Sequence, residues 1–240
     1  MQNGTVSLNA RLFPERLRFL DGSMIKLLAI VLMLIDHIAH LFGVGRELTL
    51  LSLGDWSLTL YEALRYLGRV AFPLFAFLLV EGFVHTKNRK RYAMRLFLFA
   101  LLSEIPFNLF CSGRVFYDRQ NVFFTLLFGF LALCAMEKYK DARGVLAVVG
   151  LFALSYLFGA DYKWTGYLTI LLLYALRTVP VLRAFSVTGV VGLPAGAAAL
   201  PMALYNGRRG FVGGRVLKYG FYAFYPLHLL VLVLIKLLLR

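Results

Sequence analysis

Long apolar runs dominate the chain, and short polar or charged segments separate them. Most runs approach the roughly 20 residues that an α-helix needs to cross the hydrocarbon of a bilayer. Continuous runs are typical of membrane spans, whereas the surface helices of soluble proteins carry apolar residues at 3.6-residue spacing. We place the spans at residues 24–43, 62–84, 93–111, 120–136, 143–159, 164–179, 184–205 and 218–238.

This pattern predicts an all-α integral membrane fold, a polytopic bundle of about eight transmembrane helices. Residues 1–240 form a single predicted domain, because no linker is long enough to separate two soluble units. Residues 1–23 are polar, and we expect them to lie at the membrane surface. No small-residue cleavage site follows them, so we expect the first apolar run to be retained as a helix.

Composition agrees with a membrane protein. The 240 residues are 60% hydrophobic, with a mean hydropathy of +0.75, whereas a soluble domain is about half apolar. A net charge of +14 would suggest nucleic acid in a soluble protein. Here Lys and Arg lie in short segments between apolar runs, so we expect membrane lipids as partners and no nucleic acid. Cys111 and Cys134 lack the spacing of a metal site, and we expect no metal.

The distribution of Lys and Arg predicts the orientation. These residues are dense in the N-terminal segment and in the second and fourth loops, but sparse in the first and fifth. This alternation places the N-terminus in the cytoplasm. The seventh loop breaks the alternation, because it carries Arg208, Arg209, Arg215 and Lys218. Either residues 184–205 do not cross the membrane fully, or these charges serve a site.

The first span carries ionisable residues at a depth where a charge costs from about 3 to over 10 kcal/mol. His37 lies eleven residues after Lys26, which is about 16 Å deeper along a helix. Asp36 precedes His37 and could orient its imidazole or pair with Arg or Lys on another helix. His40 lies one turn further along the same face. The two histidines could belong to a chemical site or only form polar contacts between helices.

Two further spans add charges at similar depth. Arg69 needs an anion, and Arg65, one turn before it, could pair with Glu62. Glu104 precedes Pro106, which interrupts the backbone hydrogen bonds and can open a cavity. An ion pair between Arg69 and Glu104 is the structural alternative to a ligand site.

The fourth and last spans supply further polar groups. Asn121 and Thr125 lie one turn apart and could contact a ligand or only link helices. His228 lies near mid-depth, with Tyr225 one turn before it. Four residues on four helices therefore fall near the midplane and could line one cavity: His37, Arg69, Glu104 and His228.

Five segments, in order from about residue 24 to 235, resemble the TraX family. They read IKLLAIVLMLIDHIAHLF, GRVAFPLFAFLLVEGFVHT, RLFLFALLSEIPFNLF, NVFFTLLFG and KYGFYAFYPLHL. The DH, SEIPFN and FYPLHL motifs carry most of the specificity, and residues 137–205 contribute little. The name-giving member acetylates the N-terminus of conjugative pilin. The resemblance therefore implies a bacterial inner-membrane protein with a related activity.

TraX proteins are similar to a wider superfamily of membrane acyltransferases. Its members carry a basic or amide residue, ten residues and then a histidine in the first helix, and Lys26 and His37 match this spacing. The resemblance implies that His37 is catalytic, with acyl-coenzyme A on the cytoplasmic side and the acceptor reached from the other face. The superfamily often has ten helices. Its later RxxR motif has no match here, because Arg65 and Arg69 are differently spaced.

We therefore expect a membrane acetyltransferase that moves acetyl from acetyl-coenzyme A to an amine or hydroxyl acceptor, such as a pilin N-terminus or an envelope sugar. His37 would act as general base and Asp36 would tune it, while Arg69 and Glu104 would shape the site. Tyr225 and His228 would contact the acceptor. The residues expected to contact the donor are Lys26, Lys87, Arg89, Lys90, Arg91 and Asn121.

Two other functions fit the same residues. Buried His, Asp and Glu could form the relay of a proton-coupled small-molecule transporter, although the chain shows no clear internal repeat. The chain could instead be a non-enzymatic component of pilus or secretion assembly, which predicts that substitutions of His37 and Arg69 are tolerated. In addition to lipids and an acceptor, a second copy in a homodimer is a candidate partner.

Overall fold

Helix α2 (Gly22–Phe42) begins and ends at residues suited to those positions. Asp21 accepts hydrogen bonds from two backbone N–H groups of the first turn, which a helix leaves without internal partners. Gly43 ends the helix at φ 65°, a left-handed conformation open to glycine. The structure is a computed structural model, which describes residues 15–212 and 214–239. A short 3-10 helix, η1 (Glu15–Leu17), precedes α2.

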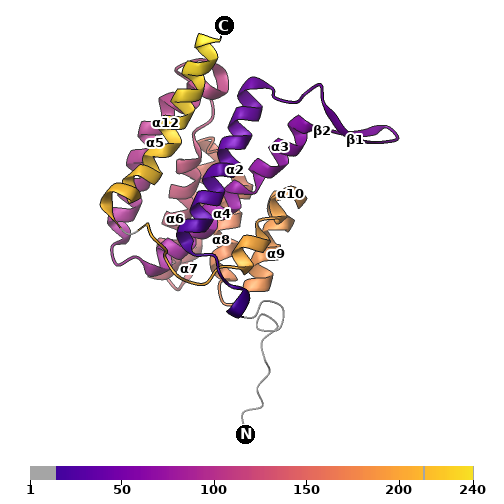
Figure 1. Ribbon diagram of the computed structural model, residues 1–240. Helices are drawn as coiled ribbons and strands as arrows, with labels where there is room; N and C mark the ends of the chain where they lie inside the picture. Colours follow the sequence, from indigo (N-terminus) through magenta and orange to yellow (C-terminus); the bar gives the residue numbers. More distant parts are fainter. Residues whose placement is uncertain (1–14, 213, 240) are drawn as a thin grey trace.

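A β-hairpin follows α2, where the sequence predicted only a loop. Strand β1 (Thr49–Leu53) pairs antiparallel with β2 (Trp56–Thr59). Gly54, at φ 60°, begins the two-residue turn between them. The hairpin projects beyond the helical bundle (Figure 1), and every residue of β1 is exposed. The rest of the fold is built from helices, as predicted.

The predicted second span consists of two helices with a break at Val70. Helix α3 (Leu60–Arg69) ends there, and α4 (Ala71–His85) begins immediately after it. Pro73 explains the break, because it has no N–H and its ring would collide with the carbonyl of Arg69 in a continuous helix.

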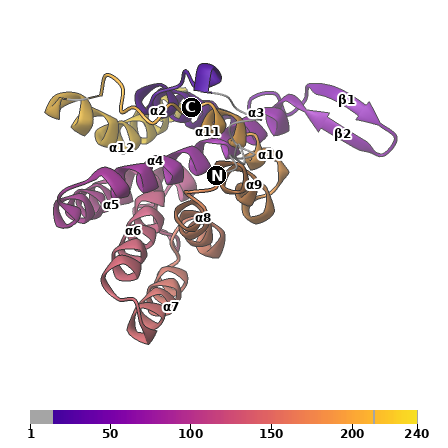
Figure 2. The same cartoon turned by 90° about the horizontal axis from the view of Figure 1, so that it is seen from below.

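Helix α4 lies at the centre of the bundle, and most of its side chains are buried. Four helices follow it: α5 (Arg89–Ser112), α6 (Val122–Lys138), α7 (Ala142–Leu157) and α8 (Lys163–Ala175). Helices α6 and α8 pack against α4, and α7 packs on their outer side (Figure 2). The ring of Phe83 on α4 meets Phe130 on α6 and Tyr174 on α8 edge to face, which joins the three helices.

Three short helices replace the predicted span 184–205. They are α9 (Pro180–Val191), α10 (Leu193–Gly196) and α11 (Ala199–Ala203). Gly192, at φ 98°, and Pro194 interrupt the helix after α9. The single long helix that was predicted here is therefore wrong.

After α11 the chain returns to the N-terminal end of α2. The backbone N–H of Asn206 donates to the carbonyl of Leu20 at 2.9 Å, and that of Gly22 donates to the carbonyl of Arg208 at 2.8 Å. The basic seventh loop therefore lies at the same end of the molecule as the start of α2. This position favours the first explanation of its charges, that residues 184–205 do not cross fully.

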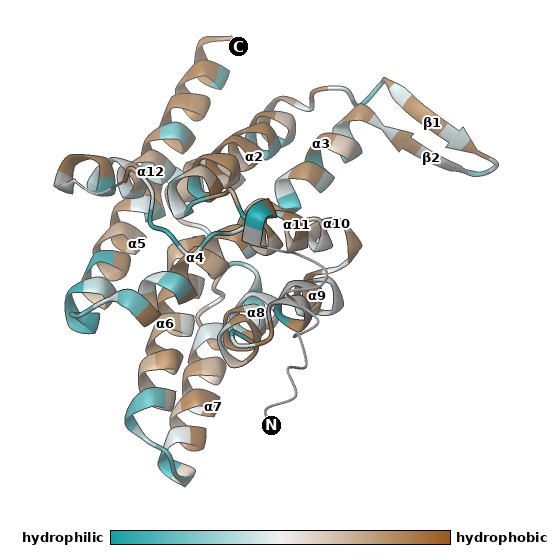
Figure 3. Cartoon of the chain, turned by 60° about the horizontal axis from the view of Figure 1, so that its bottom comes forward, coloured by the Kyte–Doolittle hydropathy of each residue, from teal (hydrophilic) through white to brown (hydrophobic). Residues whose placement is uncertain are grey.

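Helix α12 (Arg215–Leu238) runs beside α5 and α2 to the opposite end, where the C-terminus lies (Figure 1). Large apolar side chains, such as Leu227 and Leu234, are exposed along it. Figure 3 shows that apolar residues cover the helices and that many hydrophilic residues lie at helix ends and turns. In the described part of the chain, four segments are long and apolar enough to cross a membrane: Gly22–Phe42, Leu60–His85, Arg89–Ser112 and Val216–Leu238. Membrane character is supported, whereas eight crossings are not confirmed.

Candidate active site

Two histidines from distant parts of the chain meet inside the bundle. Nδ1 of His37 on α2 lies 2.7 Å from Nε2 of His228 on α12, and the two rings are parallel to within 5°. Nδ1 of His228 in turn lies 2.8 Å from the backbone oxygen of Phe224, one turn earlier on α12. The structure thus brings together two of the four residues that the sequence placed near the midplane.

Aromatic rings enclose the histidine pair. The ring centroid of Phe110 on α5 lies 4.9 Å from that of His37, and Tyr225 lies 6.5 Å from it. Phe224 stacks on His228 at 4.9 Å. Rings at these distances limit the access of water, and hydrogen bonds in such surroundings are stronger than in solvent.

Asp36 points to α3 rather than to the neighbouring imidazole. Its carboxylate accepts a hydrogen bond from Arg65 at 2.7 Å, and the two side chains are 18% and 33% exposed. Gly68 permits this contact, since a Cβ there would overlap the side chain of Asp36. Of the two roles that the sequence left open for Asp36, the structure supports a pair with a cation on another helix.

Glu62 does not pair with Arg65, as the sequence had allowed. It caps the start of α3, where its carboxylate accepts from the backbone N–H of Thr59 at 2.8 Å and its own N–H donates to the Thr59 hydroxyl.

Arg69 and Glu104, expected to share a site or an ion pair, are not paired in the described part of the chain. Arg69 is exposed, with its guanidinium 5.5 Å from the ring centre of Tyr66. Glu104 instead accepts from the amide of Asn121 at 2.8 Å. When the side-chain amide of Gln120 is oriented with its nitrogen toward Glu104, it also donates to both oxygens of that carboxylate at 3.2 Å. The Arg69–Glu104 pair is therefore wrong.

Asn121, expected to contact the donor, instead links the start of α6 to α5 through hydrogen bonds. Its amide donates to the backbone oxygen of Ala100 on α5 at 2.8 Å as well as to Glu104. Its side-chain oxygen accepts from the backbone of Phe123 and caps α6. All of its side-chain groups are engaged, so the residue is suited to structure rather than to ligand binding.

Four cations gather at the end of the bundle where α2 begins, and we call them the cationic cluster: Lys26, Arg95, Arg209 and Lys218. They come from α2, α5, the seventh loop and α12, and their charges act on one another. No carboxylate of the described residues forms an ion pair with any of them. The buried Nε of Arg95 has no hydrogen-bond partner there either. Uncompensated cations of this kind are suited to an anionic ligand.

The other predicted donor contacts lie at the connection between α4 and α5. Lys87, Lys90 and Arg91 are exposed there. Arg89 is also exposed, and its guanidinium lies 4.2 Å from the ring centre of Phe83.

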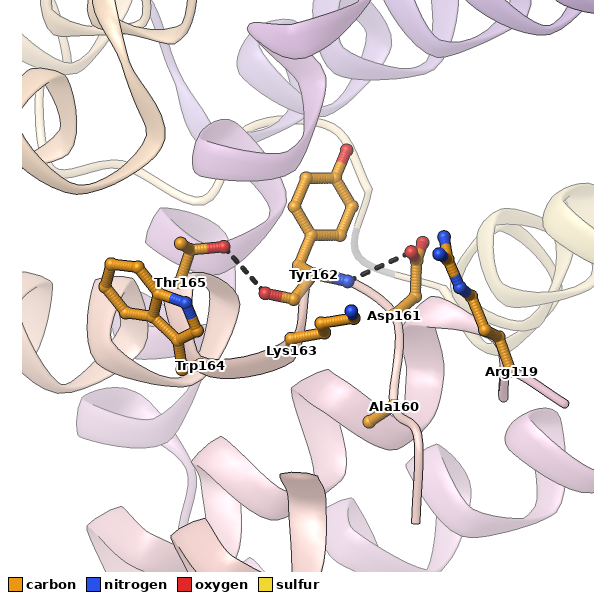
Figure 4. A pocket seen from close by; sticks show the side chains of 7 residues that line it. All are labelled: Arg119, Ala160, Asp161, Tyr162, Lys163, Trp164 and Thr165. Carbon is orange, nitrogen blue, oxygen red and sulfur yellow. Dashed lines mark hydrogen bonds between the residues drawn. The ribbon is translucent and has the colours of Figure 1, made fainter. Parts of the chain in front are cut away.

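A pocket of about 350 Å³ lies at the connection between α7 and α8. Figure 4 shows Asp161 and Arg119 facing one another in this pocket, with Lys163 near them and Trp164 farther away beside Thr165. Burial raises the pKa of Asp161 to about 6, against the opposing effects of the Tyr162 backbone N–H and Arg119. The charge of Asp161 also acts on Asp36 and Tyr225, which couples the pocket electrostatically to residues beside the histidine pair.

Hydrogen bonds hold this pocket in a strained shape. The backbone N–H of Asp161 donates to Gln120 at 2.9 Å, and the hydroxyl of Thr125 donates to the Asp161 carbonyl. Tyr162 and Lys163 adopt φ values of 60° and 45°. Each such left-handed residue that is not glycine costs on the order of 1–3 kcal/mol. The backbone is therefore fixed at the point where Asp161 enters the interior.

Sequence reasoning missed Asp161 because it lies in a short connection between two predicted spans, where an acid is ordinarily solvated. It also missed Arg183 on α9, which pairs with Glu81 on α4 at 3.1 Å. The run Asp-Tyr-Lys-Trp at 161–164, in which two charged residues alternate with two aromatic residues, is the signal that could have identified the pocket.

Comparison with known proteins places the chain in a family. The TraX protein family matches residues 21–236. The probable fimbrial assembly protein FimC, serogroup H1, of Dichelobacter nodosus is 32% identical over 251 residues, which cover 90% of this chain and 96% of that protein. No solved structure matches. With a family match over nearly its whole length and a relative of the same extent, the chain belongs to the TraX family.

Proposed function

We propose that this protein is a membrane acetyltransferase that moves acetyl from acetyl-coenzyme A to an amine or hydroxyl acceptor, with His37 as general base. One observation carries the proposal: α2 joins the cationic cluster at Lys26 to a histidine eleven residues away, at about 16 Å along the helix. The extended pantetheine arm of coenzyme A has a comparable length. Phosphates held at the cluster would therefore place the thioester beside His37.

The reaction needs a base and a group that stabilises the oxyanion. An acceptor amine first loses its ammonium proton to water. His37 then takes a proton from the acceptor nitrogen or hydroxyl oxygen as that atom attacks the thioester carbonyl. The carbon–sulfur bond then breaks, and the coenzyme leaves as a thiol after His37 returns the proton. The Tyr225 hydroxyl is our candidate for the oxyanion contact, because Asn121 is engaged and Arg69 is exposed.

The donor would bind the cationic cluster from the end of the molecule that carries most Lys and Arg. The exposed residues Lys87, Arg89, Lys90 and Arg91 would draw the polyanion toward it. Since such residues collect on the cytoplasmic side, we infer that the N-terminus faces the cytoplasm of a bacterial inner membrane.

The acceptor would enter through the pocket at Asp161. Its carboxylate suits an ammonium group, and Arg119 opposite it suits a carbonyl or carboxylate next to that amine (Figure 4). A polypeptide N-terminus carries both groups, whereas an envelope sugar carries neither in this arrangement. The name of the FimC relative, a fimbrial assembly protein, agrees with a pilus protein as acceptor.

That name also fits a second function, a non-enzymatic role in pilus assembly. The test uses purified protein in detergent, labelled acetyl-coenzyme A, and peptides with free or blocked N-termini. Acetylation of free peptides only, lost by at least about 100-fold in His37→Ala, is the expected result. His40→Ala is the control, because His40 lies one turn away and is exposed. Undiminished activity in His37→Ala would overturn the role of His37, and no transfer by wild type to any acceptor would favour the assembly role.

A further inference from the structure

The hydrogen bonds of the histidine pair define which nitrogen carries each proton. A backbone carbonyl only accepts, so Nδ1 of His228, 2.8 Å from the oxygen of Phe224, must donate its hydrogen. A neutral His228 then has its lone pair on Nε2. That atom lies 2.7 Å from Nδ1 of His37, which must be the donor in the second bond.

The pair is expected to be neutral. No carboxylate among the described residues contacts either ring. Burying an unpaired cation beside Phe110 and Phe224 would be costly. With neutral rings, the chain of donors runs in one direction, from His37 to His228 to the carbonyl of Phe224.

We propose that His228 is a positioning residue, which holds His37 in the tautomer with its proton on Nδ1 and so leaves Nε2 as the basic atom. This inference rests on the proposed function of His37. An imidazole side chain in water prefers the opposite tautomer, with its proton on Nε2. In that form, the atom turned away from His228 would be a donor and could not accept a proton from an acceptor amine.

Geometry around the pair supports orientation rather than a second base. The rings are parallel to within 5°, and Phe224 stacks on His228 with an interplanar angle of 11°. Both nitrogens of His228 are engaged, one by the carbonyl and one by His37. None of the described residues donates to Nε2 of His37, which therefore keeps its lone pair for a substrate. His228 was expected from the sequence to contact the acceptor, and this arrangement gives it a different role.

Two substitutions separate the role of acceptor from that of ring packing. His228→Phe keeps an aromatic ring but removes the nitrogen that accepts from His37. His228→Gln replaces the ring but offers a carbonyl oxygen near the place of Nε2. We expect kcat to fall by about 100-fold to 10,000-fold in His228→Phe, with an unchanged KM for acetyl-coenzyme A. The kcat of His228→Gln should be at least tenfold higher than that of His228→Phe. A purely structural role predicts instead that His228→Phe, which keeps the ring, is the more active variant.

The tautomer itself can be measured without activity. In the full-length protein labelled with ¹⁵N-histidine, Nδ1 of His37 should have the chemical shift of a protonated nitrogen and Nε2 that of an unprotonated one. The assignment of protons to Nδ1 and Nε2 of His37 should reverse or average in His228→Phe. His85→Phe is the control, because His85 is exposed at the end of α4. An unchanged His37 tautomer, or full kcat in His228→Phe, overturns the inference. If His37→Ala stays active, the proposed function fails instead, whereas the tautomer measurement still decides the inference.

Discussion

Asp36 and Arg65 form an ion pair at 2.7 Å that joins α2 to α3 across 29 positions of sequence. Neighbouring residues on a helix point about 100° apart, so the side chain of Asp36 faces α3 while His37 faces α12. The pair thus leaves the imidazole to His228 and neutralises a cation beside the histidine site.

Removing one charge of this pair should destabilise the protein. We expect Asp36→Asn to lower the free energy of unfolding by about 2 kcal/mol, because the partly buried Arg65 loses its counter-ion. Thermal unfolding in detergent, combined with Arg65→Gln in a double-mutant cycle, measures the coupling. Asp141→Asn is the matched control, because the Asp141–Arg143 pair has a similar distance of 2.8 Å but is exposed. Equal Tm shifts in the two variants would contradict the prediction.

Gly68 should be needed for the close approach of α2 and α3. In Gly68→Ala the new methyl group would overlap the Asp36 side chain near its backbone, where no flexible end can move aside. We expect a loss of about 1–3 kcal/mol and lower acetyl transfer, since His37 follows Asp36 directly. Gly150→Ala on α7 is the control, because nothing lies within 4 Å of the added carbon. A Gly68→Ala protein as stable and active as Gly150→Ala would contradict this reading of the contact.

The sequence predicted the depth of ionisable residues better than their partners. His37 and His228 do meet, because depth along two apolar helices follows from residue count alone. Glu104 has a partner other than the one expected, and only the structure decides between the two roles left open for Asp36, because pairing depends on how each helix is rotated and where helices cross. No pattern within one helix contains that information.

The irregular parts of the fold were hardest to predict. Residues 184–205 are apolar enough for a span, but Gly192 and Pro194 break the helix, and contacts with Leu20 hold the returning chain. The exposed hairpin and the half-buried Asp161 depend on tertiary placement in a similar way.

Asn121 should contribute more to stability than an exposed helix cap. Asn88 and Asn121 both accept a backbone N–H at the start of a helix, but only Asn121 also donates to Ala100 and Glu104. Loss of a cap costs about 1 kcal/mol, and leaving buried acceptors without a donor adds about 1–3 kcal/mol. Thermal unfolding should therefore show a larger fall of Tm in Asn121→Ala than in Asn88→Ala. Similar shifts would mean that the contacts with α5 are weak.

Binding of an amine acceptor should depend on pH through Asp161. Burial raises the pKa of this carboxyl to about 6, so it loses its charge, and with it the attraction for an ammonium group, as pH falls through about 6. The acceptor KM of the wild type should rise over that interval. In Asp161→Asn the acceptor KM should be high at every pH. The exposed neighbour Asp118→Asn is the control and should follow the wild type.

The ionisation of Asp161 should favour acceptor binding but lower the free energy of unfolding. Because the folded pKa of Asp161 lies above its ordinary value of 3.8, ionisation costs stability as pH rises through about 6. Asp161→Asn should therefore gain Tm relative to wild type at pH 7.5, and this advantage should shrink as pH falls from about 6 and be lost only below 3.8. The titratable groups coupled to this carboxyl are Arg119, Asp36, Cys111, Tyr162 and Tyr225. If Asp161→Asn is more stable at pH 7.5 but has a higher acceptor KM, the charge of Asp161 serves binding at the expense of folding. An unchanged acceptor KM would contradict a role for Asp161 in the acceptor site.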